Sequence, residues 1–268
     1  MKLSFITANY VARELGFNMT EGWMQGDTAA NNHYRPIETY ATRINELFGL
    51  IAAQGYSYID IWNAHLHWSW ATPEHIDIAK AALQRHALTP LCYCGRFGDT
   101  EAEFSKSCYT AQAMGMNILA GSTPLLAQNR MAVAAILAEH DCYLAIENHP
   151  AEKTPADVLV QIGDGCQGRI GTAIDTGWWG TQGYDAADAI DELYPYILAV
   201  HLKDVLAVGG HDTCRFGQGV VPIMRCIQLL KQRGYKGPLS IEHEPNTFDP
   251  TEDCVAMRQM VRYELGLA

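Results

Sequence analysis

Strand-like and helix-like segments alternate eight times along this chain of 268 residues. Each apolar run of five or six residues is followed by a segment with helical periodicity. Eight strand–helix units favour an α/β fold with a closed parallel (β/α)8 barrel over a doubly wound sheet. We expect one barrel domain over residues 1–268, with strands at 2–7, 57–62, 89–94, 117–121, 142–147, 170–175, 196–201 and 238–242 and helices at 37–54, 72–86, 99–114, 128–140, 154–163, 185–193, 220–233 and 250–265.

Local signals mark the ends of several of these helices. Thr72 and Thr154 each precede a proline, which is typical of an N-cap followed by the first helical residue. Glycines stand where four helices should stop, at Gly55, Gly115, Gly163 and Gly234.

Four of the strand-like runs end on a residue that can bind a metal ion. These residues are Glu147, Asp175, His201 and Glu242, separated by 175−147 = 28, 201−175 = 26 and 242−201 = 41 positions. Each gap has room for one strand–helix–strand step, and a barrel gathers the C-terminal ends of its strands on one face. The four side chains should therefore meet there as an oxygen-rich site for a divalent metal.

Two connections are longer than a typical βα loop. They run over 8–36 and 204–220, and they carry polar and aromatic residues such as Trp23, Asp27 and His211. Both begin at C-terminal strand ends, so we expect them to cover the active face.

Composition excludes several classes of function. A net charge of −11 argues against a nucleic-acid surface, which needs a basic stripe. No stretch of eighteen apolar residues indicates a transmembrane helix, and the segment from Met1 to Ile6 predicts a strand rather than a secretory signal. Eight scattered cysteines without a Cys-x-x-Cys pair predict reduced, mostly buried thiols and a cytoplasmic location.

The strand-end motifs resemble those of a known family. The runs Ile146-Glu147-Asn148-His149-Pro150, Ile174-Asp175-Thr176-Gly177, Val200-His201-Leu202-Lys203-Asp204 and Leu239-Ser240-Ile241-Glu242-His243-Glu244 are similar to those of the sugar phosphate isomerase/epimerase group. These xylose-isomerase-like barrels include ketose 3-epimerases, inosose isomerases and dehydratases. The resemblance spans nearly the whole chain and extends to Gly217-Gln218-Gly219.

The resemblance implies that Glu147, Asp175, His201 and Glu242 are the metal ligands, and that the two glutamates also move the proton. Three carboxylates and one imidazole prefer a hard octahedral ion, so Mn²⁺ is the first choice, with Mg²⁺, Co²⁺ and Zn²⁺ as alternatives.

Two positions depart from the epimerase pattern. Trp178 stands where those enzymes have a histidine, and Lys153 stands where they have a substrate-contacting glutamate. A tryptophan at this position favours a cyclic sugar or an aglycone over an open-chain ketose.

Other polar or aromatic residues near strand ends are candidates for the site. His149 is either a catalytic base or a structural histidine, and Lys203 either contacts substrate or pairs with an acid. After the second strand, we expect one of His65 and His67 to face inward, with His65 as the candidate substrate ligand. Trp62 either packs in the core or stacks on a sugar face, and it is a candidate substrate-binding residue. Arg215 is a candidate clamp for an anionic substrate group.

We therefore expect a metal-dependent sugar or polyol isomerase or epimerase that abstracts an α-proton and forms an enediolate. Its catalytic residues would be Glu147, Glu242 and His149, and Trp178 would contact the substrate. The alternatives are a lyase, either an inosose-type dehydratase or the catalytic subunit of a C-glycoside-cleaving enzyme, and a non-catalytic binding barrel. The expected partner is a small carbohydrate, and the sequence is compatible with a homo-oligomer or a small partner subunit.

Overall fold

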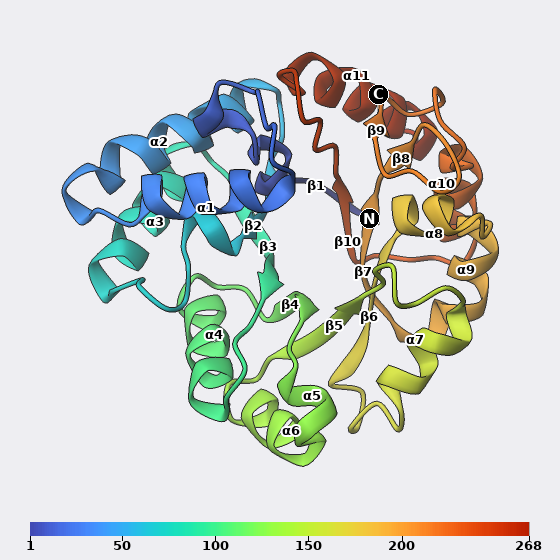
Figure 1. Cartoon of the computed structure of the whole chain (residues 1–268), viewed down its shortest axis with the longest axis horizontal. Coiled ribbons are helices and arrows are strands. Elements are labelled where there is room, and N and C mark those ends of the chain that lie inside the picture. Colours follow the sequence, from blue (N-terminus) through green and yellow to red (C-terminus); the bar gives the residue numbers. More distant parts are fainter. Residues whose placement is uncertain (268) are drawn as a thin grey trace.

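The computed structural model of this chain describes residues 1–267. Eight parallel strands close into a barrel in the order β1-β10-β7-β6-β5-β4-β3-β2 (Figure 1). The (β/α)8 prediction is therefore confirmed. The strands of the barrel are β1 (Lys2–Ile6), β2 (Tyr58–Trp62), β3 (Thr89–Arg96), β4 (Ile118–Ser122), β5 (Tyr143–Glu147), β6 (Ile170–Asp175), β7 (Ile197–Leu202) and β10 (Pro238–Ile241).

Helices surround the ring of strands (Figure 1). Their apolar faces and the outward side chains of the strands form one large core cluster. None of the helices in residues 1–267 combines the length and hydropathy needed to cross a bilayer. The helices are α1 (Trp23–Tyr34), α2 (Ile37–Ala53), α3 (Pro73–Arg85), α4 (Glu101–Ala113), α5 (Leu125–Gln128), α6 (Arg130–Glu139), α7 (Pro155–Ile162), α8 (Thr176–Gln182), α9 (Ala186–Leu193), α10 (Ile223–Gln232) and α11 (Thr251–Leu265).

The helix-end signals operate as expected. The Thr72 hydroxyl accepts a hydrogen bond from the backbone N–H of His75, and Pro73 is the first residue of α3. At α7, the Asp157 carboxylate accepts hydrogen bonds from the backbone N–H and the hydroxyl of Thr154. The four glycines predicted to end helices all have positive φ, the conformation that glycine adopts most readily: Gly55, Gly115, Gly163 and Gly234.

The inside of the barrel is filled by small side chains beneath the C-terminal end. Successive residues of a strand alternate between its two faces. Because Ser122, Glu147 and His201 line a cavity at that end, the residues two positions earlier also face inward. Those positions and their counterpart in β6 are alanines, which belong to a second, smaller core cluster: Ala120, Ala145, Ala173 and Ala199. Small residues here leave depth for the cavity above them.

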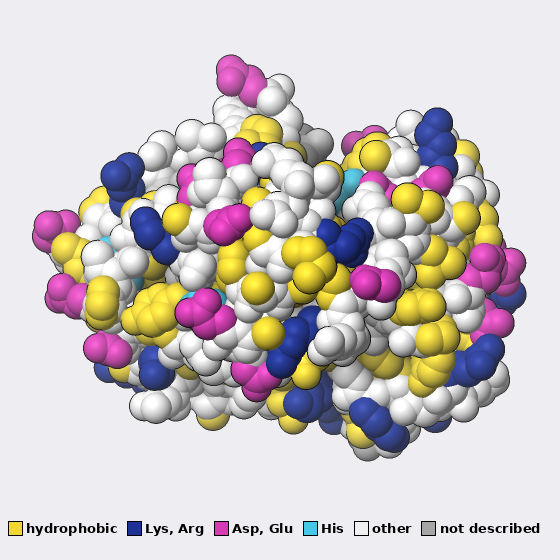
Figure 2. Space-filling model, turned by 90° about the horizontal axis from the view of Figure 1, so that it is seen from below, with side chains coloured by type: hydrophobic (Ala, Val, Ile, Leu, Met, Phe, Trp, Pro, Cys, Tyr) yellow, Lys and Arg dark blue, Asp and Glu magenta, His cyan; other side chains and the backbone are white. Residues whose placement is uncertain are grey.

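The two long connections are more ordered than the sequence suggests. The first forms two short 3-10 turns and the helix α1, which was expected as loop. The second forms a two-stranded hairpin, β8 (Asp204–Val205) with β9 (Thr213–Cys214). On the face of the molecule in Figure 2, basic side chains are scattered among acidic ones and form no continuous stripe.

Candidate metal centre and its cavity

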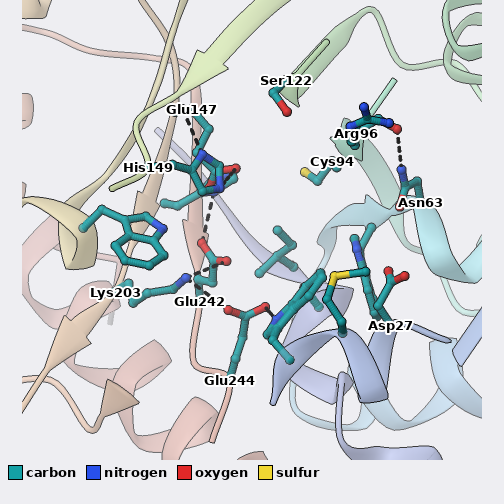
Figure 3. Close-up of a pocket in the computed structure, with 18 of the residues that line it drawn as sticks. Asp27, Asn63, Cys94, Arg96, Ser122, Glu147, His149, Lys203, Glu242 and Glu244 are labelled. Carbon is teal, nitrogen blue, oxygen red and sulfur yellow. Dashed lines mark hydrogen bonds and ion pairs between the residues drawn. The ribbon is translucent and has the colours of Figure 1, made fainter. Parts of the chain in front are cut away.

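A cavity of about 670 Å³ opens among the residues that follow the C-terminal ends of the strands. This volume lies within the range of small-molecule sites. Figure 3 shows Glu147, His149, Lys203 and Glu242 gathered on one side, with Asn63 and Arg96 on the other. The lining residues are Ile6, Ala8, Trp23, Met24, Asp27, Trp62, Asn63, His67, Trp68, Cys94, Gly95, Arg96, Ser122, Glu147, His149, Trp178, His201, Lys203, His211, Glu242 and Glu244.

Three of the four predicted ligands converge in this cavity. Glu147, His201 and Glu242 each offer a ligand atom, and these atoms lie within 4.8 Å of one another. Nδ1 of His201 is 2.8 Å from Oε1 of Glu147 and 3.1 Å from Oε2 of Glu242. Although burial opposes it, the proximity of the two carboxylates holds the pKa of His201 well above its usual value.

Asp175, the fourth predicted ligand, lies beside this cluster and is fully buried. One carboxylate oxygen caps α8, accepting hydrogen bonds from the N–H groups of Gly177 at 2.7 Å and Trp178 at 3.1 Å. The other oxygen faces the Lys203 ammonium at 3.1 Å. Burial raises the pKa of Asp175 to about 6, even though the Lys203 charge acts in the opposite direction.

The Lys203 ammonium is the cationic centre of the site. Nζ lies 3.0 Å from Glu242, 3.1 Å from Asp175 and 3.1 Å from Glu244. Against the effect of burial, these three carboxylates hold the pKa of Lys203 well above its usual value. Gly177 makes room for the lysine stem, because a Cβ there would lie 2.6 Å from Cγ of Lys203.

The donor set fits a divalent cation. Oδ2 of Asp175 and Oε2 of Glu242 are buried and make no hydrogen bond among the described residues, although each has one ion-pair neighbour at 3.1 Å, Lys203 Nζ for Asp175 and His201 Nδ1 for Glu242. A buried carboxylate oxygen without a hydrogen bond is costly, and a bound divalent ion would give both oxygens a direct ligand contact. Carboxylates with one imidazole suit Mn²⁺, Mg²⁺ or Zn²⁺ by ligand type.

His149 lies at the cavity edge, two residues after Glu147. Its Nδ1 is 3.1 Å from the Glu147 carbonyl oxygen, and its Nε2 is 3.9 Å from Oε2 of the same residue. The intervening Asn148 forms two 2.9 Å hydrogen bonds with the backbone of Asp175, which ties the ends of β5 and β6 together.

Aromatic side chains form two walls. Trp62, at the end of β2, packs against Trp23 of α1 with ring centroids 5.1 Å apart. On the other wall, Trp178 stacks on His211, with centroids 3.5 Å apart and planes at 8°. Thus Trp62 and Trp178 both line the cavity, and one face of the Trp178 indole is covered by His211 rather than left free for a ligand.

Two predicted substrate-binding residues do not line the cavity. His65 is buried, with Nδ1 2.9 Å from Thr7 Oγ1, and it is His67 that faces the cavity instead. The Arg215 guanidinium is engaged by the Asp253 carboxylate, which also contacts His243. An anion clamp at Arg215 would require breaking this ion pair.

Sequence reasoning missed Glu244 as a site residue. Its side chain lines the cavity, and it accepts hydrogen bonds from the Trp23 indole at 3.1 Å and from Lys203 at 3.1 Å. Burial raises the pKa of Glu244 to about 7. The signal was available, because the two-residue period of an extended chain places Glu244 on the same side as Glu242.

Comparisons with known proteins agree with this fold. A family model described as "Xylose isomerase-like TIM barrel" matches residues 10–260. The L-ribulose-5-phosphate 3-epimerase of Shigella boydii is 40% identical over 74 residues, which are 27% of this chain and only 26% of that relative.

Solved structures with low sequence identity to this chain share its fold. The 3-keto-D-glucoside 4-epimerase of E. coli superposes with a TM-score of 0.66 at 15% identity, covering 98% of this chain and 99% of that one. A probable 3-DHS dehydratase of Bacillus anthracis superposes with a TM-score of 0.69 at 15% identity, covering 97% and 98%. Likeness at this identity establishes the fold alone.

Proposed function

The chain belongs to the xylose isomerase-like TIM barrel family, and from this premise we propose that it isomerises or epimerises a sugar or polyol with the help of a divalent metal. The observation that carries the proposal is the convergence of Glu147, His201 and Glu242 within one cavity at the C-terminal end of the barrel. This is the face on which barrel enzymes build their active sites.

We propose Glu147, Asp175, His201 and Glu242 as the residues that would hold the metal, with Mn²⁺ as the first choice. Asp175 is included because its Oδ2 is buried without a hydrogen bond and faces the same cation, Lys203, as Glu242 does. When bound, a divalent ion supplies polarisation of a substrate carbonyl and of the neighbouring hydroxyl.

The proton is moved by this chain's own side chains. Either Glu147, Glu242 or His149 removes the proton from the carbon next to the carbonyl, and a second of these groups returns it. Return of this proton to the former carbonyl carbon, together with transfer of the hydroxyl proton from one enediolate oxygen to the other, gives isomerisation. Return to the opposite face of the original carbon gives epimerisation. Both outcomes pass through an enediolate. His149 Nε2 and Glu147 Oε2 lie 3.9 Å apart, which is too long for a direct hydrogen bond, so a proton passing between them would need a bridging water or substrate hydroxyl.

A metal-dependent lyase is the second candidate. It begins with the same proton abstraction and then expels a leaving group from the adjacent carbon. The aromatic wall of Trp178 and His211, within a cavity of about 670 Å³, favours a ring that carries such a group. The substrates in both cases are keto-sugars or keto-polyols.

A panel of ketoses, inososes and 3-keto-glycosides in D2O, with Mn²⁺ or with a chelator, tests the proposal by NMR. We expect Mn²⁺-dependent incorporation of deuterium at the carbon next to the carbonyl of at least one compound. Rearranged product indicates the isomerase, and a released aglycone or water indicates the lyase. Replacing His201 with Ala should abolish both exchange and metal content. Exchange that persists in this variant would contradict the site.

A further inference from the structure

The wall formed by Trp178 and His211 contains a histidine whose protonation state can be deduced from its neighbours. His211 belongs to the loop between β8 and β9, and it lines the cavity. Its Nδ1 lies 2.8 Å from the hydroxyl oxygen of Thr181 in α8. That hydroxyl also lies 2.7 Å from the carbonyl oxygen of Gly210.

These two contacts fix the tautomer of His211. A carbonyl oxygen can only accept, so the single hydroxyl proton of Thr181 is donated to Gly210. The Thr181 oxygen must then accept a hydrogen bond from His211, which requires a proton on Nδ1. Nε2 is therefore left with a lone pair and no proton. The loop holds this arrangement, because the N–H of Gly209 also donates to the Thr181 carbonyl at 2.8 Å.

The imidazole stays neutral. Burial, together with the nearby Lys203 ammonium, lowers the pKa of His211 to about 3. Stacking on Trp178 at 3.5 Å fixes the plane of the ring. Nε2 is thus a fixed hydrogen-bond acceptor that does not become a donor near neutral pH.

The charges around the cavity disfavour an anionic ligand. Four carboxylates of the chain line it, from Asp27, Glu147, Glu242 and Glu244. Its three cationic side chains are Lys203, Arg96 and the protonated His201, which contacts Glu147 and Glu242. Lys203 contacts three carboxylates, as described above. The Arg96 guanidinium is 58% exposed and bridges to Asp99 at 2.5 Å. None of these three cations is free to bind a phosphate dianion without giving up an ion pair.

We infer that His211 determines specificity in this cavity, by accepting at Nε2 a hydrogen bond from a hydroxyl group of an uncharged sugar ring. The same lone pair repels a phosphate oxygen, which is also an acceptor. The inference rests on the proposed function, and it narrows the substrate to an unphosphorylated ring. It differs from the chemistry in the name of the L-ribulose-5-phosphate 3-epimerase that shares a 74-residue match. Thr181 is a positioning residue, since it acts through His211.

The tautomer can be tested without any substrate. In protein labelled with ¹⁵N-histidine, we expect His211 to show a protonated Nδ1 and an unprotonated Nε2 at pH 7. Thr181→Val, which keeps the side-chain shape but removes the hydroxyl, should shift His211 towards a mixture of tautomers. A protonated Nε2 in the wild-type protein would overturn the inference.

Recognition can be tested by binding, with methyl β-D-glucopyranoside as the uncharged probe and glucose 6-phosphate as the charged one. We expect the glucoside to bind more tightly. His211→Phe retains the stacking and lacks the acceptor, so it should weaken glucoside binding roughly threefold to tenfold. His211→Gln, which places an amide oxygen near the Nε2 position, should recover part of the loss.

Equal or tighter binding of glucose 6-phosphate would overturn the inference, and so would unchanged glucoside affinity in a folded His211→Phe protein. Neither readout depends on turnover. A failure of deuterium exchange across the substrate panel would therefore count against the proposed reaction and not against the role of His211.

Discussion

Lys203 gives the sharpest test of the electrostatics of the site. Its ammonium is almost fully buried and lies within 3.1 Å of Asp175, Glu242 and Glu244. Replacing it with Met preserves most of the stem beside Gly177 and removes the charge. The carboxylates would then be buried without their cation, which typically costs about 3–5 kcal/mol.

In a chelator, this cost should lower the melting temperature of Lys203→Met by roughly 6–20 °C, at about 2–4 °C per kcal/mol for a chain near this size. A divalent ion at a hundred times its dissociation constant stabilises a one-site protein by about 2.7 kcal/mol. Mn²⁺ should stabilise the Lys203→Met variant more than it stabilises the wild type, because the added ion takes over neutralisation of Asp175 and Glu242. Saturating Mn²⁺ should therefore remove much of the difference in melting temperature between the two proteins.

Differential scanning fluorimetry of both proteins, with EDTA or with excess Mn²⁺, measures the effect. Lys153→Met is the matched control, because Lys153 is exposed and should stay within about 0.5 kcal/mol of wild type. A Lys203→Met protein that melts within about 2 °C of wild type in EDTA, less than one kcal/mol of change, would refute the reasoning. An equal Mn²⁺ shift in both proteins would do the same.

Three further predictions follow from neighbouring residues. His149→Ala should keep its metal, measured by elemental analysis, and lose ~10²–10⁴-fold in rate if it carries the proton; a change of less than about threefold, well below that range, makes it structural. Gly177→Ala places a Cβ 2.6 Å from the Lys203 stem and should cost about 1–3 kcal/mol in urea unfolding. Gly210→Ala is the control, because a Cβ there would have its nearest neighbour 3.8 Å away and should leave the stability almost unchanged. Equal losses of stability in the two variants would count against the steric argument. Burial lowers the pKa of His65 to about 3, so between pH 6.5 and 3 this histidine is protonated in the unfolded chain and neutral in the folded protein. The contribution of His65 to the free energy of unfolding is therefore complete above pH 6.5, and it falls by up to about 1.4 kcal/mol per pH unit as the pH drops towards 3. In urea unfolding at several pH values, His65→Gln should reduce this pH dependence, and an unchanged pH dependence would contradict the prediction.

The barrel was predictable because its signals are local. Apolar runs, threonine–proline starts and glycine stops lie within a few residues of the elements they define. The convergence of Glu147, His201 and Glu242 followed from the topology, since parallel strands bring their C-terminal ends to one face.

Two helices at the site were not predictable from the same signals. α1 is largely polar, and Gly26 in its middle is required because a Cβ there would lie 2.5 Å from the carbonyl oxygen of Val11. α8 has only seven residues, and Gly177 is required in it because a Cβ at this position would collide with the Lys203 side chain. In both cases a long-range contact dictates a residue that disfavours a helix locally.

The contacts between individual side chains were the feature least predictable from the sequence. Nothing near Arg215 in the sequence shows that Asp253 engages it, and nothing near His65 shows that Thr7 does. The stacking of His211 on Trp178 joins residues 211−178 = 33 positions apart through a loop without a regular pattern. Such pairings depend on tertiary packing, which sequence periodicity does not encode.

The central claim is that one divalent ion is held by Glu147, Asp175, His201 and Glu242. Anomalous scattering at the manganese edge, from crystals grown with Mn²⁺, tests it most directly. The account predicts a single strong peak about 2.0–2.5 Å from a carboxylate oxygen of each acid and from a ring nitrogen of His201. A strong peak elsewhere in the chain, or none here at saturating Mn²⁺, would contradict it.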